Sequence, residues 1–495
     1  MAQQPVLVII GAGIGGLAAG VYAQMSGFET HIFEQHTIPG GFCTSWKRKG
    51  YLFDGCIHDL AGAGSNSPLN HLWQELCPDR LENIHYHDVI TQVEDSHGHH
   101  LTVYANIDRF EAHLKSIAPE DAGVIKEYCA AARYFLAHDF YALQEATPAD
   151  FLQWFPHLPF LFRWGRQSLE QVARKFKNPF LREAFPKIQY NFAGCPALVQ
   201  MGFLAAQHKK EMGWPAGGSL AFAQSIARRF TRLGGQLHYH SRVRKVLVEN
   251  DQACGVELED GQQQRADWVI SAGDGHTTIF KLLEGKYTNK FLRHYYTCAP
   301  DENSMNLQVS LGINRNLSGL PRAIFYHLEQ PVSIAGHEVK DLEIEIYNYD
   351  PSIAPQGKSV IRLLSTSPYS YWNALGYGSE AYQQEKQKVA DAFIDLLLQR
   401  FPDIRQDIEV VDVATPITSE RYTASYHGLQ AWYPEGQFGR ILMKGISPNL
   451  PGLKRFSMTG QWSNGMMGIN SVAITSRNLI RSLCKKFKMR FETTG

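Results

Sequence analysis

The sequence predicts an α/β protein that begins with a strand–helix–strand unit of a parallel sheet. Three observations lead to this prediction. Val6–Ile10 is a continuous apolar run, as expected of a strand covered on both faces. A helix-like stretch at 17–25 follows a glycine-rich turn, and a second short strand at 30–33 comes next. Strands that alternate with helices in this way favour a parallel sheet.

The turn after the first strand has the pattern G-x-G-x-x-G, at residues 11–16. Gly11 would make the tight turn, Gly13 would let the backbone approach a pyrophosphate, and Gly16 would let the helix lie close to the sheet. Free N–H groups at the helix start would hold the phosphate charge. Glu34 lies roughly 20 residues after the glycines, where a carboxylate can accept hydrogen bonds from a ribose. These features predict a Rossmann-like dinucleotide-binding unit that prefers a free 2′-hydroxyl.

Composition limits the classes of partner and site. Lys plus Arg and Asp plus Glu are both 48, so the net charge of zero gives no reason to expect nucleic acid binding. The eight cysteines show no C-x-x-C pair and no zinc-like spacing with histidine, so we expect reduced thiols and no metal site. His97, His99 and His100 lie in a polar stretch that fits a solvated hairpin tip better than a metal site.

Two later segments resemble the first, because each combines strand patterns with a helix-like stretch that follows small residues. A Trp-Pro-Ala-Gly-Gly-Ser turn at 214–219 precedes a helix-like stretch at 220–233. Strand patterns follow at 237–239, 243–249, 253–259 and 268–271, which predicts a β-meander and a strand that returns to the parallel sheet. Near the end, a short strand and loop at 451–462 precede a helix-like stretch at 472–485, whose start is rich in small residues.

The glycine pair Gly40 and Gly41 lies a few residues after Glu34, where it is either a simple surface turn or a place for the chain to pass close to a dinucleotide. With this pair, the first segment resembles the FAD-binding start of the flavin amine oxidase and phytoene desaturase superfamily. All three segments occur in the order of that superfamily. The resemblance is closest to the carotenoid isomerase, retinol saturase and phytoene desaturase branch, through residues 50–58, 214–219, 350–355 and 415–422.

This resemblance implies a Rossmann-like FAD-binding domain of the glutathione-reductase type with an interleaved α+β substrate domain. The FAD-binding domain would comprise 1–100, 200–290 and 430–495, and the substrate domain 101–199 and 291–429. In the superfamily the residue after the glycine of the last strand is usually acidic, whereas this chain has Gln461. The implied cofactor-binding residues are Gly11, Gly13, Ile14, Gly15, Gly16, Glu34, Gln35, Gly40, Gly41, Phe42, Val243, Gly460, Gln461, Gly468, Ile469 and Asn470.

The resemblance also implies an FAD-dependent oxidoreductase that desaturates, saturates or isomerises carbon–carbon bonds of a carotenoid, an isoprenoid or another long apolar substrate. His58 and Asp54 would lie near the flavin and are the catalytic candidates, although His58 has the alternative of a hydrogen-bonded structural residue. With only one G-x-G-x-x-G, electrons would go to or come from an external partner: oxygen, a quinone, another carrier or a visiting nicotinamide. A flavin amine oxidase that acts on a polar amine is the second hypothesis.

The region 151–164 is rich in Phe, Trp and Leu and contains Pro156 and Pro159, so it cannot form a long regular helix. It could line an apolar substrate cavity, dip into a bilayer with Arg163 and Arg166 at headgroup level, or form an ordinary core helix pair. The first two of these alternatives, the cavity lining and the membrane-dipping surface, favour an apolar substrate over an amine. No apolar run approaches the length of a membrane span, and the first strand starts at Val6, so we expect a cytoplasmic protein with peripheral membrane contact as an open alternative.

Overall fold

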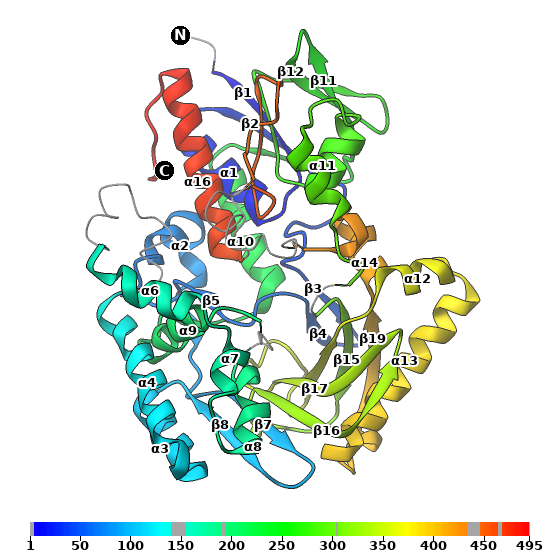
Figure 1. Cartoon of the computed structure of the whole chain (residues 1–495). Coiled ribbons are helices and arrows are strands. Elements are labelled where there is room, and N and C mark those ends of the chain that lie inside the picture. The colour runs from blue at the N-terminus through cyan, green and yellow to red at the C-terminus, as the bar shows by residue number, and fades with distance from the viewer. Residues whose placement is uncertain are drawn as a thin grey trace.

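A five-stranded sheet lies at the end of the molecule where both chain termini are found (Figure 1). The structure is a computed structural model that describes residues 4–139, 155–189, 194–302, 305–430, 432, 446–463 and 468–494. All neighbouring strands of this sheet are parallel, and in spatial order they are β10 (Gln236–His238), β2 (Glu29–Phe33), β1 (Val6–Ile10), β14 (Trp268–Ser271) and β20 (Phe456–Met458). The predicted α/β class is confirmed.

Three helices from distant parts of the chain pack beside this sheet: α1 (Ile14–Met25), α10 (Gly218–Arg232) and α16 (Ile469–Phe487). α1 contacts both of the others. The central strand β1 is buried on both faces, which explains its uninterrupted apolar sequence. The sheet and helices that the first, second and last segments predicted therefore come together in one unit.

The predicted meander is confirmed as a separate antiparallel sheet of β11 (Val243–Glu249), β12 (Gln252–Leu258) and β13 (Gln263–Arg265). The predicted turn at 214–219 is partly wrong, because Trp214 and Pro215 lie in β9 (Met212–Pro215). That strand pairs with β5 (Leu60–Ala61) and β6 (Ile84–His85). Its backbone therefore has ladder partners that the local sequence does not reveal. A hairpin of β3 (Ser45–Arg48) and β4 (Tyr51–Asp54) follows the glycine pair.

A seven-stranded mixed sheet forms the other half of the molecule (Figure 1). In spatial order its strands are β19 (Ile408–Ala414), β15 (Leu307–Ile313), β18 (Ser359–Ser365), β17 (His337–Tyr347), β16 (Ala323–Ile334), β7 (Val89–Asp95) and β8 (His100–Tyr104). Only β16 and β7 run parallel among these neighbours. β7 and β8 form the predicted hairpin with the histidine-rich tip.

The long helix α13 (Glu380–Arg400) packs on one face of this sheet, where alternate residues of β17 (Leu342, Ile344, Ile346) enter a shared apolar core. Asp341, Glu343 and Glu345 alternate with these apolar residues and lie on the opposite face. Helices on that side build a second core with β7 and β8: α3 (Ile107–Ile117), α4 (Ala122–Ala137), α6 (Leu158–Gly165), α7 (Leu169–Ala173), α8 (Pro179–Ala184) and α9 (Ala197–His208).

The remaining α-helices are α2 (Asn70–Leu76), α11 (Lys290–Thr297), α12 (Tyr369–Leu375) and α14 (Pro416–Thr423). A single-turn helix η6 (Thr277–Leu282) has π-type hydrogen bonding, and 3₁₀ turns include η4 (Phe155–His157), η5 (Phe185–Lys187) and η8 (Tyr426–Gly428). The described part of the proline-containing apolar region is only η4 and the short α6, as its prolines predict. Within the described residues, no helix has both the length and the apolar character needed to cross a membrane.

The division into FAD-binding and substrate domains at 1–100, 101–199, 200–290, 291–429 and 430–495 stays a prediction. The strand pairing gives information on the boundary at residue 100 only. β7 lies within 1–100 in sequence, yet it pairs with β16 and β8 in the seven-stranded sheet.

Candidate functional site

A cavity of about 440 Å³ opens at the carboxyl ends of the parallel strands. Crevices at this edge are where open α/β sheets bind their ligands. Its walls come from the first, second and last of the predicted cofactor-binding segments, and also from the end of α14 and the turn after it. The lining stretches are 10–15, 33–35, 40–43, 242–244, 271–274, 277–278, 422–425, 460–462 and 468–469.

The glycine turn at the floor of this cavity is held together by close backbone packing. Gly11 has φ +94°, and a Cβ on Gly16 would lie 1.9 Å from the Gly11 carbonyl oxygen. The Gly40 N–H donates to the Ala12 carbonyl at 2.8 Å, so the glycine pair does pass directly over the turn. A side chain at Gly40 would clash with the Cys43 carbonyl at 2.2 Å. Only glycine fits these positions.

Two helices begin at this cavity without a side-chain cap. Gly13 precedes α1 and Gly468 precedes α16, and a glycine at the capping position offers no side chain to accept from the first N–H groups. Both helix starts line the cavity. Their uncapped N–H groups and helix dipoles favour an anionic or electron-rich ligand.

Glu34 lies at the carboxyl end of β2 and is 7% exposed. Its two oxygens accept from the Ala12 N–H at 2.7 Å and the His36 N–H at 2.8 Å. Burial raises the pKa of this carboxyl and outweighs the backbone N–H groups, which favour the charged form. Each carboxylate oxygen has room for a further donor, so a ribose hydroxyl fits here.

Asp274 follows β14 and carries an orphaned polar atom. Its Oδ1 accepts from the Thr277 N–H at 2.7 Å, whereas its Oδ2 is buried with no partner among the described residues. Burial raises the pKa of Asp274 to about 6, against the hydrogen bonds that favour the charge. A buried carboxylate oxygen on the wall of the cavity needs a donor, and a ligand hydroxyl would provide one.

We expect Asp274→Asn to stabilise the cofactor-free protein increasingly as the pH rises from 4 to 8. The folded-state pKa of about 6 lies above the ordinary 3.8, so between these two values the native state holds a proton that the unfolded state has lost. Wild-type stability therefore falls as the pH rises through this window and levels off above it. The gain in unfolding free energy should reach on the order of 2–3 kcal/mol at pH 8 and vanish at pH 4. Urea denaturation across this pH range measures it. A constant difference at all pH values would contradict this.

The structure brings the predicted cofactor residues together with two exceptions. Gly16 packs against Gly11 beneath the turn and Asn470 lies in the first turn of α16, and neither lines the cavity, while the other predicted residues do. That they bind a cofactor stays a prediction. Sequence reasoning did not include Asp274, Thr277 and Thr278, although their place directly after β14 was a usable signal.

His58 and Asp54, the catalytic candidates, lie outside the cavity wall, although Cys56 between them is part of it. His58 Nδ1 contacts Glu345 on β17 and lies 3.3 Å from the Arg362 guanidinium on β18. Arg362 Nε donates to Glu345 at 2.7 Å. Burial alone would raise the pKa of Glu345, but Arg362 and then His58 hold it well below the ordinary value.

Asp54 is 1% exposed and its carboxylate is already fully engaged. It accepts from Ser45 Oγ at 2.8 Å, from the Ser219 N–H and Oγ at 2.7 Å each, and from the Cys56 N–H at 3.0 Å. It therefore ties the β3–β4 hairpin to the start of α10, which leaves little capacity for proton transfer.

Residues 9–76 match the family model of an NAD(P)-binding Rossmann-like domain. The chain is 27% identical over 454 residues to the chloroplastic prolycopene isomerase of Daucus carota, covering 87% of this chain and 72% of that protein. It is 27% identical over 439 residues to the lycopene-forming phytoene desaturase of Pseudescherichia vulneris, with 83% and 85% covered. The all-trans-retinol 13,14-reductase of Danio rerio is 24% identical over 500 residues, with 92% and 82% covered.

These carotenoid and retinoid enzymes are homologues of the chain. The resemblance stated from the sequence is thus confirmed. Among solved structures, a putrescine oxidase variant superposes with a TM-score of 0.62 at 13% identity, covering 98% of this chain and 99% of that one. At this identity the likeness shows the fold alone, so it gives no support to the amine oxidase hypothesis.

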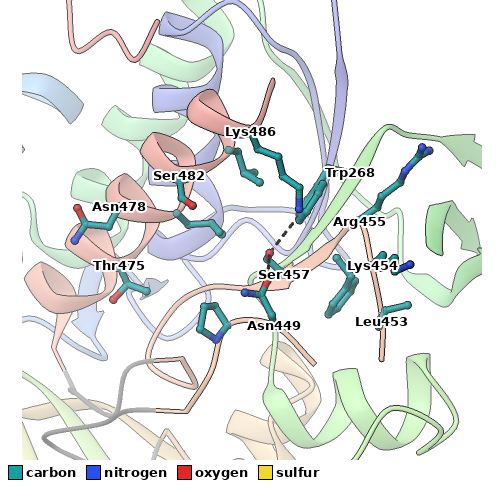
Figure 2. A pocket seen from close by; sticks show the side chains of 14 residues that line it. Trp268, Asn449, Leu453, Lys454, Arg455, Ser457, Thr475, Asn478, Ser482 and Lys486 are labelled. Atoms are coloured by element: carbon teal, nitrogen blue, oxygen red, sulfur yellow. Dashed lines mark hydrogen bonds between the residues drawn. The ribbon is translucent and has the colours of Figure 1, made fainter. Parts of the chain in front are cut away.

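A second cavity of about 380 Å³ lies between β20, the start of β14 and α16. Figure 2 shows its polar chain, in which Trp268 Nε1 donates to Ser457 Oγ and Ser457 Oγ donates to Asn449. The Lys486 ammonium lies 4.1 Å from the centre of the Trp268 ring. This cavity contains none of the predicted site residues. The described residues also contain no group of three or more His, Cys, Asp or Glu placed to hold a metal ion.

Proposed function

We propose that the protein is an FAD-dependent oxidoreductase that acts on carbon–carbon bonds of a carotenoid, an isoprenoid or another long apolar molecule. The main support is the cavity where the glycine turn, Glu34 and two uncapped helix starts converge, in a chain whose homologues are carotenoid and retinoid enzymes. The reaction would be a desaturation, a saturation or a cis–trans isomerisation.

The cofactor would be FAD, held non-covalently, and when bound it would supply the redox chemistry. The N–H groups at the start of α1 would bind the pyrophosphate, and Glu34 would bind the adenosine ribose. Val243 would lie beside the adenine through its backbone. Gln461, Gly468, Ile469 and Asn470 would approach the flavin end, with Asp274 available to a hydroxyl of the sugar chain. The matched Rossmann-like model supports the dinucleotide, and the choice of FAD is our inference.

His58 would be the residue that gives or takes a proton on the substrate side, because Glu345 and Arg362 fix its ring through Nδ1. Proton exchange would then take place at the other ring nitrogen, Nε2. We assign Asp54 a positioning role instead, since its hydrogen bonds hold the β3–β4 hairpin and the start of α10. An external electron acceptor or donor would complete any reaction with net redox change.

We expect Glu34→Ala to weaken FAD binding by on the order of 1–3 kcal/mol, because a buried ribose and the Ala12 and His36 N–H groups lose their acceptor. Titration of the apoprotein with FAD measures the dissociation constant. Glu34→Gln keeps one acceptor oxygen and should lose less. Unchanged affinity in Glu34→Ala would mean that another residue holds the ribose.

The activity test gives the purified flavoprotein liposomes that contain candidate polyenes and follows the products by chromatography. A changed double-bond number or geometry is the expected result. Hydrogen peroxide released from polar amines, with every polyene unchanged, would instead identify an amine oxidase.

The substrate would enter from a membrane surface through the described part of the apolar region. Phe155 is 71% exposed and Phe162 57% exposed. Arg166 lies over the Phe162 ring, and Arg163 lies over the ring of the neighbouring Trp164. Transfer of an apolar molecule from lipid to water costs about 25 cal/mol of free energy per Å² of exposed surface, so direct entry from the bilayer is favoured. Trp154 lies outside the described residues, and Phe160 is half-buried against Tyr134.

We expect the double change Phe155→Ser and Phe162→Ser to lower sedimentation with liposomes roughly tenfold or more. Each change removes about 1.5–3 kcal/mol of free energy that burial of the ring in lipid would contribute to binding. FAD content should stay unchanged. Val411→Ser on β19, which removes an apolar side chain that is 41% exposed elsewhere, is the matched control. Wild-type protein that never sediments with liposomes would contradict this prediction.

A further inference from the structure

Glu343 is a buried carboxyl in the middle of β17 that the proposed chemistry does not use. It is 7% exposed and lies on the same face of the strand as Asp341 and Glu345. Across the ladder its neighbours are apolar, Leu364 on β18 and Phe325 on β16. The site is therefore a polar group set between two apolar side chains.

The acids on either side of Glu343 are both paired. Asp341 accepts from Lys187 Nζ at 2.6 Å and contacts His327 at 2.7 Å. Glu345 binds Arg362 and His58. Glu343 itself has no hydrogen bond or ion pair to any residue in the described ranges. Burial, and then the charge of Glu345, raises the pKa of Glu343 to about 8, so it is a neutral acid that can donate a hydrogen bond near pH 7.

The segment around Lys187 contacts β17 from the side where the helices pack. It carries a second polar side chain without a partner among the described residues. Gln189 is 1% exposed, and both its amide nitrogen and its amide oxygen lack partners among the described residues. Gln189 lies two residues after Lys187, and Lys187 binds Asp341. Asp341 is a neighbour of Glu343 on the same face of β17. On α9, Gln200 is 2% exposed and its Nε2 also lacks a described partner.

Buried polar groups without partners are rare in native proteins, and a bound ligand is one explanation for each. We propose that Glu343, together with Gln189, forms a polar subsite that hydrogen-bonds an oxygen function, such as a carbonyl or a hydroxyl, on an otherwise apolar polyene. The inference rests on the proposed function and narrows its substrate class. A pure hydrocarbon would leave these groups unpaired, which disfavours it.

The test measures binding of two probes to the holoprotein, β-carotene and its 4-keto derivative, which differ by one carbonyl. We expect wild type at pH 6.5 to bind the ketone at least tenfold more tightly than the hydrocarbon. The preference should fall above pH 8, because a ketone only accepts hydrogen bonds and the ionised Glu343 has none to donate. Glu343→Gln should keep the preference at pH 6.5 and at pH 9.5, since its amide donates at both.

Glu343→Leu should lose the preference, and Ile344→Val, on the opposite face of the same strand, should keep it. If Glu343→Leu does not fold, the pH dependence of wild type against Glu343→Gln still decides. Equal binding of both probes by wild type, or a preference that Glu343→Leu retains, would overturn the subsite. Failure to bind either probe would contradict the proposed function as well.

Discussion

We expect Gly16→Ala to lose its flavin and to be destabilised by about 3 kcal/mol or more. The added Cβ would lie 1.9 Å from the Gly11 carbonyl oxygen and 3.2 Å from the Ala272 side chain. The first contact is backbone, so α1 must move away from β1 or the turn must open. Either movement displaces the N–H groups that face the cavity. Thermal unfolding and the flavin-to-protein absorbance ratio measure the two effects.

Two other glycines serve as controls. At Gly13 an added Cβ meets nothing closer than the Gly40 carbonyl oxygen at 3.9 Å, but it points where a pyrophosphate would lie, so Gly13→Ala should fold and bind FAD weakly. At Gly123, in the first turn of α4, nothing lies within 4 Å, and Gly123→Ala should leave the flavin content unchanged and raise stability by at most about 1 kcal/mol. A stable Gly16→Ala protein with full flavin content would contradict this expectation.

The second large effect is expected from Arg362→Met, which should lower the free energy of unfolding by about 3–5 kcal/mol. Arg362 is 2% exposed and binds Glu345 and the Asp54 carbonyl, the latter at 2.8 Å. Its loss leaves the Glu345 charge buried with His58 and Tyr347 as its remaining contacts among the described residues and with Arg322 as a more distant cation. Urea denaturation at pH 7 measures the difference.

The double variant Arg362→Met with Glu345→Met should recover much of the lost stability, because it removes both charges. Arg174→Met breaks an exposed ion pair to Glu170 on α7 and should cost less than about 1 kcal/mol. If Arg362→Met costs no more than Arg174→Met, the cluster does not hold the strands as described.

The first segment could be predicted because its signals are local. The apolar run of β1, the glycine pattern and Glu34 occupy one short stretch, and each has a direct steric or electrostatic reason. The start of α1 is harder to predict, because the helix begins at Ile14 whereas its sequence pattern suggests a start at residue 17. Gly15 and Gly16 are poor helix formers, and they are helical here because close packing against Gly11 and α16 requires glycine.

The seven-stranded sheet and the charged cluster could not be predicted in the same way. β7 pairs with β16 from a distant part of the sequence, Gln92 with Ile324, and no local pattern indicates that partner. His58 was a candidate from its position alone, while its partners Glu345 and Arg362 come from strands far along the sequence. Pairings of this kind depend on the tertiary fold, which the residues of one strand do not encode by themselves.

The proposed function is tested most directly by mixing the purified protein anaerobically with a polyene while the flavin spectrum and the polyene products are recorded. Heat should first release FAD from the same preparation. A desaturase should bleach its oxidised flavin, a saturase should reoxidise a chemically reduced one, and an isomerase should convert the polyene with the flavin unchanged. Release of FMN or of NAD alone, or bleaching by polar amines with no change in any polyene, would contradict a flavoenzyme that acts on carbon–carbon bonds.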